Sequence, residues 1–238
     1  MNKLTDRLQL IYDEISAGET VADIGTDHGF LPLALIKSGK SPHVIMSDIS
    51  EGSLAKCREN CEAFSAYSEK KEAFDIRLGS GLEVISPSEV DTVVIAGMGG
   101  MLIMELMGND PYLSHSIKKF ILQPRRHIGR LRYWLLDNNY RIAKESLVRE
   151  SRFIWPILTV VPGNRALMAN SDSSDVEYEY PLTLLYFRNE LTEEYLRNAH
   201  RIETEKLASK RSAEVPDFFE IRHQAHRVKR LEYLLNLL

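Results

Sequence analysis

Cysteine is scarce in this sequence, and long apolar runs are missing. Its two cysteines, Cys57 and Cys61, lie four residues apart in a helix-like segment, which puts both thiols on one helical face. A metal site would need further cysteines or histidines close by, so we expect buried or half-buried free thiols and no metal. No stretch of eighteen apolar residues occurs, and the first residues, MNKLTDRLQ, do not form a signal sequence. We therefore expect a cytoplasmic protein that does not span a membrane.

The sequence also has no excess of positive charge. Its formal net charge is −4, so an interaction with nucleic acid has to be argued from local clusters of charge. With 238 residues, of which 44% are hydrophobic, the chain is long enough for one good-sized domain and an appendage.

A glycine-bearing turn after the first predicted strand is the most informative stretch. The strand runs from Thr20 to Ile24, and the turn leads into the apolar-periodic segment Leu31 to Ile36. Such a strand–turn–helix leaves backbone N–H groups unpaired at the helix start, and glycine lets a ligand approach the backbone closely. The turn has the spacing Asp-x-Gly-x-x-x-Gly, from Asp23 to Gly29, and not the G-x-G-x-x-G of dinucleotide-binding turns. The pattern argues against NAD, and a tight turn without any ligand would also explain it.

A second acid, Asp48, closes the next predicted strand, His43 to Ser47. An acid ending the first strand, the Asp-x-Gly loop and an acid ending the second strand together resemble the class I S-adenosylmethionine-dependent methyltransferases. In that family the first acid, here Asp23, lies near the methionine amino group, and the second, here Asp48, holds the ribose hydroxyls. The resemblance therefore implies S-adenosylmethionine as the cofactor.

Two further glycine-bearing loops follow predicted strands. Gly79-Ser80-Gly81 comes after the strand Ala73 to Leu78 and is expected to face the adenine of the cofactor, unless it is a plain turn. Gly97-Met98-Gly99-Gly100 follows the buried strand Asp91 to Ala96 and leads into a helix. In adenine-N6 methyltransferases this second loop carries an acid or amide, two prolines and an aromatic residue, and this chain lacks that motif. Three glycines instead make a low wall with exposed N–H groups, which suits a methyl donor that a bulky acceptor approaches closely.

Three motifs in this order carry a more specific resemblance. They are ADIGTDHGFLP, AGMGG and the tripeptide Leu122-Gln123-Pro124, followed by a helical C-terminal extension. Together they resemble the bacterial tRNA adenine-N1 methyltransferases that modify adenine 22, over essentially the whole chain. The resemblance implies an α/β fold, with a Rossmann-like class I methyltransferase domain (mostly parallel sheet, helices on both faces) and a C-terminal α-helical hairpin of coiled-coil type. It also implies S-adenosylmethionine as methyl donor and tRNA as acceptor.

The family's cofactor residues transfer to matching positions of this sequence. The expected cofactor-binding residues are Asp23, Gly25, Thr26, Asp48, Ile49, Gly79, Ser80, Gly81, Ala96, Gly97, Gly99 and Gly100. The chain departs from the family pattern at Gly29-Phe30, Ser80 and Arg125, where the pattern has Ala-Tyr, Asp and Asn. Ser80 offers the adenine amino group only its hydroxyl oxygen, and Phe30 lacks the hydroxyl that a tyrosine would bring.

Asp27 and His28 are the candidate catalytic residues. Adenine N1 has a free lone pair at neutral pH and attacks the sulfonium methyl directly, so the enzyme has to align and desolvate the reactants more than supply a strong base. Asp27 lies in the cofactor turn without being needed for the cofactor's polar groups, so we expect it to contact the adenine amino group. Its alternative role is to cap the following helix. His28 would orient that carboxylate or meet a phosphate, or would be a packed structural histidine.

The segment from Pro111 to Leu136 has no acidic residue and six basic ones. These are Lys118, Lys119, Arg125, Arg126, Arg130 and Arg132. An uncompensated cluster of this kind is the electrostatic footprint of phosphate binding, and it straddles the Gln123-Pro124 loop. We expect tRNA contacts from Arg7, Gln123, Arg125, Arg126 and Arg130. The alternatives are a solvated helix face for Arg126 to Arg132 and, for Arg7, a helix that only covers the sheet.

The predicted sheet ends with strands near Tyr140–Leu147 and Phe153–Val161, which are antiparallel to each other. Trp155 is interpreted as core or sheet edge and not as a base-stacking platform. The chain divides into a methyltransferase domain (1–162), a linker and peripheral segment without clear period (163–190) and a helical hairpin (191–238).

The predicted hairpin consists of helices from Thr192 to Ser212 and from Asp217 to Leu238, each with an apolar seam. The seam residues are Leu191, Tyr195, Ala199, Ile202 and Leu207 in the first helix, and Ile221, Ala225, Val228, Leu231, Leu235 and Leu238 in the second. Nine basic and eight acidic residues follow from Leu191 onward, so an RNA-binding arm requires the charges to segregate onto one face. A solvated hairpin and a dimerisation element are the alternatives, and we expect a monomer or weak dimer.

Two other functions stay open on the sequence. One is a methyltransferase that acts on another RNA base or on a small molecule. The other is a non-catalytic RNA-binding protein that has kept the fold.

Overall fold

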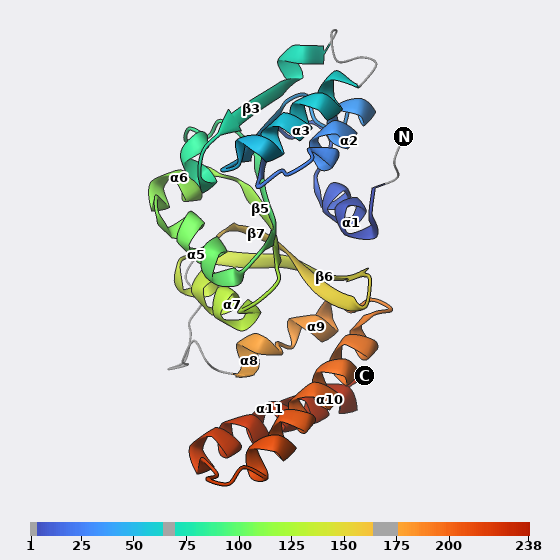
Figure 1. Ribbon diagram of the computed structural model, residues 1–238, viewed down its shortest axis with the longest axis vertical. Coiled ribbons are helices and arrows are strands. Elements are labelled where there is room, and N and C mark those ends of the chain that lie inside the picture. Colours follow the sequence, from blue (N-terminus) through green and yellow to red (C-terminus); the bar gives the residue numbers. More distant parts are fainter. Residues whose placement is uncertain (1–3, 64–69, 164–175) are drawn as a thin grey trace.

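The computed structural model describes residues 4–63, 70–163 and 176–238, and its centre is a seven-stranded sheet in the order β3-β2-β1-β4-β5-β7-β6. The strands are β1 (Val21–Ile24), β2 (Val44–Asp48), β3 (Phe74–Leu78), β4 (Thr92–Met98), β5 (Lys119–Pro124), β6 (Tyr140–Glu150) and β7 (Phe153–Pro162). Strands β1 to β5 pair in parallel, and β7 alone runs antiparallel to its two neighbours. The predicted Rossmann-like, mostly parallel sheet is confirmed (Figure 1).

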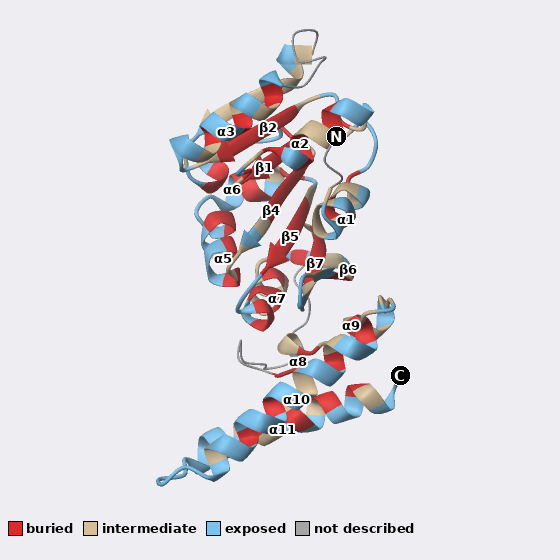
Figure 2. Ribbon diagram, turned by 45° about the vertical axis from the view of Figure 1, so that its right-hand side comes forward, coloured by how far each residue is buried: buried red, intermediate tan, exposed pale blue. Residues whose placement is uncertain are grey.

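Helices cover both faces of this sheet, which is why its central strands are mostly buried and largely apolar (Figure 2). One face is covered by α1 (Asp6–Glu14), α2 (Phe30–Ser38) and α3 (Glu51–Glu62). The other face is covered by α5 (Gly100–Gly108), α6 (Pro111–Ser116), α7 (Ile128–Asp137) and the 3-10 turn η2 (Gly81–Val84). A second 3-10 turn, η1 (Lys71–Ala73), leads into β3. The short helix α6 is an addition to the elements predicted from the sequence.

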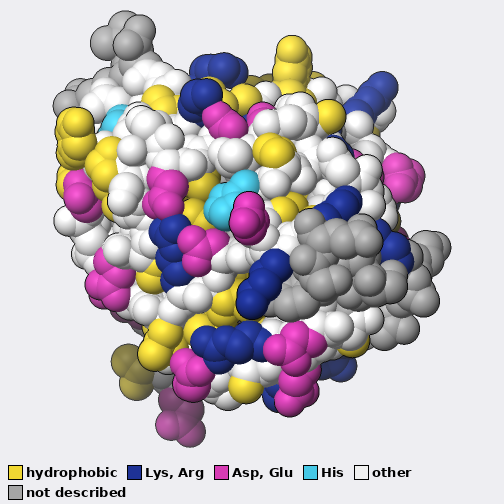
Figure 3. Space-filling model, turned by 90° about the horizontal axis from the view of Figure 1, so that it is seen from above, with side chains coloured by type: hydrophobic (Ala, Val, Ile, Leu, Met, Phe, Trp, Pro, Cys, Tyr) yellow, Lys and Arg dark blue, Asp and Glu magenta, His cyan; other side chains and the backbone are white. Residues whose placement is uncertain are grey.

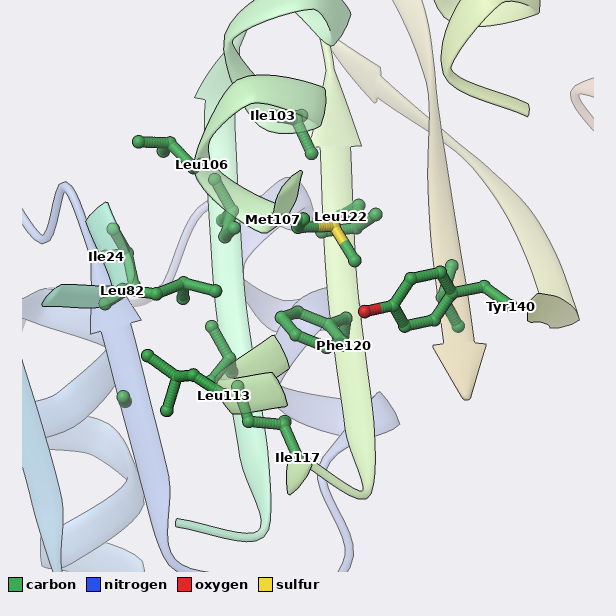
Figure 4. Packing of buried hydrophobic residues seen from close by; sticks show 14 of the residues in the cluster. Ile24, Leu82, Ile103, Leu106, Met107, Leu113, Ile117, Phe120, Leu122 and Tyr140 are labelled. Carbon is green, nitrogen blue, oxygen red and sulfur yellow. The ribbon is translucent and has the colours of Figure 1, made fainter. Parts of the chain in front are cut away.

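Each face has its own apolar layer. Figure 4 shows part of the layer under α5 and α6, where the ring of Phe120 packs edge to face against Tyr140, with centroids 6.0 Å apart. The opposite layer contains Cys57 and Cys61 of α3, which are buried free thiols as predicted. The Cys57 sulfur lies 3.4 Å from the Met46 sulfur, so this thiol is an apolar packing element.

The linker contains more structure than the sequence indicated. Two short helices, α8 (Val176–Glu179) and α9 (Thr183–Tyr186), form where the sequence shows no clear period. Helices of four residues are too short to show a period, and these two form because Val176, Tyr180 and Leu184 are buried in a third apolar cluster with the hairpin. The rest of the predicted loop, residues 164–175, lies outside the described residues.

The C-terminal hairpin consists of α10 (Thr192–Arg211) and α11 (Phe218–Asn236), and it projects from the sheet beyond α8 and α9 (Figure 1). The predicted seam is right for Leu207, Val228 and Leu231, which are buried. It is wrong for Ile202, which is 41% exposed, because the neighbouring Glu203 takes the buried position, and for Leu238, which is 42% exposed beyond the end of α11.

Glu203 is accommodated in the seam by four side-chain partners, one of which is the Tyr180 hydroxyl, which donates to its Oε1 (3.3 Å). Its carboxylate accepts hydrogen bonds from Gln224 Nε2 (2.7 Å), Arg227 Nε (2.8 Å) and Lys206 Nζ (2.9 Å). Burial alone would raise the pKa of Glu203, but these partners lower it to about 2. A buried charge with full pairing therefore replaces the apolar residue that the pattern predicts at this level.

Among the described helices, none is both long enough and apolar enough to cross a membrane.

Candidate active site

The turn after β1 lies at the carboxyl edge of the central strands. β1 sits between β2 and β4, at the point where the strand order reverses and where ligands bind in open α/β sheets. The N–H groups of Gly25 and Thr26 donate to the carbonyl of Ser47 (2.8 and 2.9 Å), which fastens the turn to β2. Gly25 has φ +77°, and a Cβ there would lie 2.5 Å from Met98 Cε. The turn therefore passes close to the end of β4, which continues through an irregularity at Gly97 to Met98, and the two together border one open edge.

Asp23 is a buried carboxylate beneath this turn. It is 7% exposed, and its Oδ2 accepts a hydrogen bond from Thr26 Oγ1 (2.9 Å). Burial raises the pKa of Asp23 to about 6, and the Thr26 hydrogen bond and the charge of Arg7 only partly oppose this. Because no ion pair with a described residue neutralises Asp23, this carboxylate is suited to a cationic group of a ligand.

Asp48 ends β2 and has two exposed apolar neighbours. Its Oδ1 accepts a hydrogen bond from the Ser50 N–H (2.8 Å) at the start of α3. Ile49 is 76% exposed, and Leu78, which pairs with Asp48 in the sheet, is 58% exposed. Exposed apolar side chains beside a carboxylate suit a nucleoside, whose base is flat and apolar and whose ribose carries hydroxyl donors. Leu78 was not predicted from the sequence; the signal was an apolar last residue of the strand beside the acid.

The loop Gly79-Ser80-Gly81 divides into two parts. The Gly79 N–H donates to the Asp48 carbonyl (3.1 Å), and the exposed Ser80 donates its N–H to Glu83 Oε1 (2.6 Å). Gly81 is buried with φ +55°, and a Cβ there would lie 2.4 Å from Leu106 Cδ2. The glycine at position 81 is therefore explained by packing against α5, and its contact with the cofactor stays a prediction.

Gln123 fastens the Gly97 loop from inside. Its side chain is fully buried, its Oε1 accepts a hydrogen bond from the Gly97 N–H (3.0 Å), and its Nε2 donates to the Pro124 carbonyl (3.3 Å). Gly97 itself is exposed with φ +79° and follows the half-buried Ala96. The predicted tRNA contact of Gln123 is corrected, because its amide faces the interior and shapes the glycine loop.

Gly99 and Gly100 begin α5 in different surroundings. Nothing lies within 4 Å of a Cβ built on Gly99. A Cβ on Gly100 would lie 2.6 Å from the His127 carbonyl oxygen and 2.8 Å from that of Arg126, and the Gly100 N–H donates to the latter (2.8 Å). Gly100 therefore joins the start of α5 to the loop after β5. Gly99 has no side chain, so nothing at this position obstructs the open edge.

We expect Gly100→Ala to lower the free energy of unfolding by about 2 kcal/mol, as is common for overpacking. The two carbonyl oxygens belong to the backbone and move aside only if the whole loop shifts. Urea denaturation measures the effect, and Gly99→Ala is the matched control. Because Gly99 is the N-cap of α5, where alanine is less favourable than glycine, this control is expected to cost less than about 1 kcal/mol. Equal losses in the two variants would contradict this account of Gly100.

Asp27 and His28 are exposed at the turn. Asp27 has φ +52°, and α2 begins after Gly29 without a side-chain cap, so the alternative capping role of Asp27 is excluded in this structure. The Asp27 Oδ2 lies 3.6 Å from His28 Nε2, and the His28 ring stacks on Phe30 with centroids 5.4 Å apart. With side chains 65% and 40% exposed, Asp27 and His28 are both open to an acceptor.

The chain matches proteins of known chemistry. A family model described as a methyltransferase domain matches residues 4–158. The tRNA (adenine(22)-N(1))-methyltransferase of Bacillus subtilis (strain 168) is 33% identical over 165 residues, which are 68% of this chain and 67% of that protein. The chain belongs to the family of tRNA (adenine(22)-N(1))-methyltransferases.

Two solved structures extend the likeness over the whole chain. The crystal structure of the B. subtilis m1A22 tRNA methyltransferase TrmK has a TM-score of 0.83 at 25% identity, covering 98% of this chain and 99% of that one. Streptococcus pneumoniae Sp1610 in complex with S-adenosyl-L-methionine has a TM-score of 0.82 at 25% identity, covering 98% of this chain and 100% of that one. The C-terminal hairpin is therefore part of the shared fold.

The basic segment of this methyltransferase is not the uncompensated cluster that the sequence predicted. Four of its six charges have acidic partners from other elements: Lys118 with Asp91, Lys119 with Glu19, Arg125 with Glu150, and Arg132 with Glu145. These acids lie outside the segment, so counting charges within it missed them. Arg126 and Arg130 are exposed and form no ion pair with any residue in the described ranges. On the face seen from above in Figure 3, Lys and Arg side chains lie next to Asp and Glu side chains.

Proposed function

We propose that this methyltransferase transfers the methyl group of S-adenosylmethionine to N1 of adenine 22 in tRNA. The observation that carries the proposal is its 33% identity to the B. subtilis enzyme of that name. The open edge supports the proposal, since Asp23, Asp48 and the Gly97 loop all lie at the carboxyl edge of the central strands. An enzyme of tRNA is expected in the cytoplasm.

The residues at this edge fit the proposed cofactor. The buried carboxylate of Asp23 would hold the ammonium of the methionine part, and Asp48 would hold the ribose hydroxyls. Ile49 and Leu78 offer apolar surface for the adenine. The sulfonium of the bound cofactor supplies an activated methyl group, and the low wall at Gly97 and Gly99 leaves an approach to it.

Asp27 and His28 lie on the acceptor side of the proposed site. Because adenine N1 already carries a lone pair, these residues are needed for orientation more than for proton removal. The exposed carboxylate of Asp27 would accept a hydrogen bond from the adenine amino group. The His28 ring, stacked on Phe30, would hold that carboxylate in place.

The proposal is tested with purified protein, labelled S-adenosylmethionine and unmodified tRNA. After digestion, mass spectrometry should find label in 1-methyladenosine. A tRNA with guanine at position 22 is the matched control and should take up no label. Label in another nucleoside would favour the alternative of a different RNA base, and no transfer to any tRNA would refute the proposal.

We expect cofactor binding to depend on pH through Asp23. The pKa of this carboxyl is about 6 in the folded protein, above its ordinary value of 3.8. Below pH 6 the neutral carboxyl no longer attracts an ammonium, so the dissociation constant should rise by up to about tenfold per pH unit as the pH falls from 6 to 5. Calorimetry in two buffers of different ionisation heat should also show proton release on binding near pH 6. Asp23→Asn is the control; if it keeps the pH dependence of the wild type, Asp23 is not the cause.

The raised pKa of Asp23 has the opposite effect on the stability of the folded protein without cofactor. Because folding raises the pKa of Asp23, its charge disfavours the folded state above pH 6. This cost disappears as the pH falls towards the ordinary value of 3.8. Cofactor binding and cofactor-free stability should therefore respond in opposite directions to acid in this range.

We also propose the division into residues 1–162, 163–190 and 191–238, since the residues at the open edge all lie in the first part. In solution we infer a monomer or weak dimer. Light scattering across a range of protein concentrations tests the oligomeric state.

A further inference from the structure

Glu150, at the end of β6, holds two arginines with one carboxylate. Its Oε1 accepts a hydrogen bond from Arg7 Nε (2.7 Å), and its Oε2 accepts one from Arg125 Nη2 (2.9 Å). Arg7 comes from α1 and Arg125 from the loop after β5, so the acid joins three elements that are distant in sequence. The three side chains are 18%, 40% and 28% exposed for Arg7, Arg125 and Glu150, so the cluster is half-buried at the molecular edge.

The cluster lies against the candidate active site. The Arg125 N–H donates to the Met98 carbonyl (2.8 Å), and its Nε lies 3.8 Å from where a Cβ on Gly97 would be. The guanidinium of Arg125 is 5.7 Å from the ring centroid of Trp155, a contact typical of a cation over an aromatic face. Arg7 is close enough to Asp23 for its charge to act on that carboxyl. Both arginines therefore border the edge that an acceptor adenine approaches.

Each arginine uses only part of its set of N–H donors to bind Glu150. A guanidinium has five N–H donors in a rigid fork that matches phosphate oxygens. In the ion pairs with Glu150, Arg7 uses Nε and Arg125 uses Nη2. The cluster also keeps a positive charge, since two arginines share one acid. It is thus able to bind an anion while remaining ordered.

We propose that Glu150 is a positioning residue, which orders Arg7 and Arg125 to bind a backbone phosphate of the tRNA beside the target adenine. This inference rests on the proposed function. A free arginine loses side-chain entropy when a ligand immobilises it, and Glu150 and Trp155 impose that order before tRNA binds.

A simple electrostatic role predicts the opposite result. If Glu150 acted only as a negative charge near the tRNA, its removal would strengthen the attraction of phosphates and lower the tRNA KM. A positioning role predicts that the tRNA KM rises although the protein becomes more positive. The direction of the change therefore separates the two roles.

The test is steady-state kinetics of Glu150→Gln with tRNA and S-adenosylmethionine varied separately. We expect the tRNA KM to rise on the order of tenfold, with kcat and the KM for S-adenosylmethionine within about twofold of wild type. Since Glu150 acts through Arg125, the effect of Glu150→Gln should be clearly smaller in an Arg125→Ala background. Glu193→Gln is the matched control, because Glu193 pairs with Arg197 on the exposed face of α10, 2.7 Å away. It should behave as wild type.

An unchanged or lowered tRNA KM for Glu150→Gln, or full additivity with Arg125→Ala, would overturn the inference. Arg125→Lys gives a second test that does not depend on the folding of the Glu150 variant. It keeps the charge and loses the planar fork, so its tRNA KM should also rise; a wild-type value would count against the inference. If wild-type protein forms no 1-methyladenosine, the proposed function itself fails. Active wild type with an insensitive Glu150→Gln refutes only the role of Glu150.

Discussion

Asp48→Ala is expected to weaken S-adenosylmethionine binding about 100-fold while the protein stays folded. Hydrogen bonds from ribose hydroxyls to a carboxylate are charge-assisted, and each contributes about 1.5–3 kcal/mol. Losing about 3 kcal/mol corresponds to roughly a hundredfold rise in the dissociation constant. Among the described residues, the Asp48 carboxylate accepts one hydrogen bond, from the Ser50 N–H, so little of the fold depends on this side chain. Isothermal titration calorimetry measures the loss directly.

Two further variants make this result specific. Asp48→Asn keeps an acceptor for Ser50 and loses the charge, so its cofactor affinity should lie between wild type and Asp48→Ala. Arg126→Ala should weaken tRNA binding and leave the cofactor affinity within about twofold, because its exposed side chain lies in the loop after β5. Equal losses of cofactor affinity in Asp48→Ala and Arg126→Ala would contradict the division into cofactor and tRNA residues.

The largest loss of stability is expected from Glu145→Ala. Glu145 and Arg132 are both 2% exposed and form a buried ion pair. Arg132 also donates to the carbonyls of Tyr178 (2.8 Å) and Glu179 (3.0 Å), and Thr183 Oγ1 donates to Glu145 (3.0 Å). Removing the acid leaves a buried guanidinium without its counter-charge, which typically costs about 3–5 kcal/mol. This is a large part of the roughly 5–15 kcal/mol that stabilises a typical domain.

Chemical denaturation with and without the substitution tests this expectation. Glu193→Ala removes an acid from an exposed ion pair with Arg197 and should cost less than about 1 kcal/mol. If Glu145→Ala costs no more than Glu193→Ala, the buried pair does not hold α8 and α9 against the sheet as the contacts indicate.

The cofactor turn shows what local sequence is able to predict. The strand that carries Asp23, the glycine-bearing turn and the acid Asp48 can each be predicted from a few consecutive residues, because strands and tight turns depend on neighbours along the chain. The hairpin was predicted for the same reason, since the seam of α11 repeats within one helix. The order of the motifs then led to the family that the comparisons show.

Gln123 and Arg132 show where local reading fails. Both were assigned to a basic rim, yet Gln123 is buried under Gly97 and Arg132 is buried against Glu145. A long polar side chain is exposed or buried according to whether partners from other elements surround it, and its own segment does not contain them. Glu203 takes the buried position predicted for Ile202 for the same reason, because Arg227 and Gln224 of α11 donate hydrogen bonds to its carboxylate.

The sequence by itself determined the places of the glycine loops, of both acids and of the helical hairpin, since each depends on short-range pattern. The order of its motifs implied the mostly parallel α/β sheet through the family resemblance that they carry. Only the tertiary structure decided which charges are free. It paired Lys118, Lys119, Arg125 and Arg132 with acids from other elements and left Arg126 and Arg130 without an ion pair in the described part of the chain. It also showed Glu150 between Arg7 and Arg125. The physical reason is that electrostatic pairing acts through space, over distances that the sheet topology sets and that separation along the chain does not reveal.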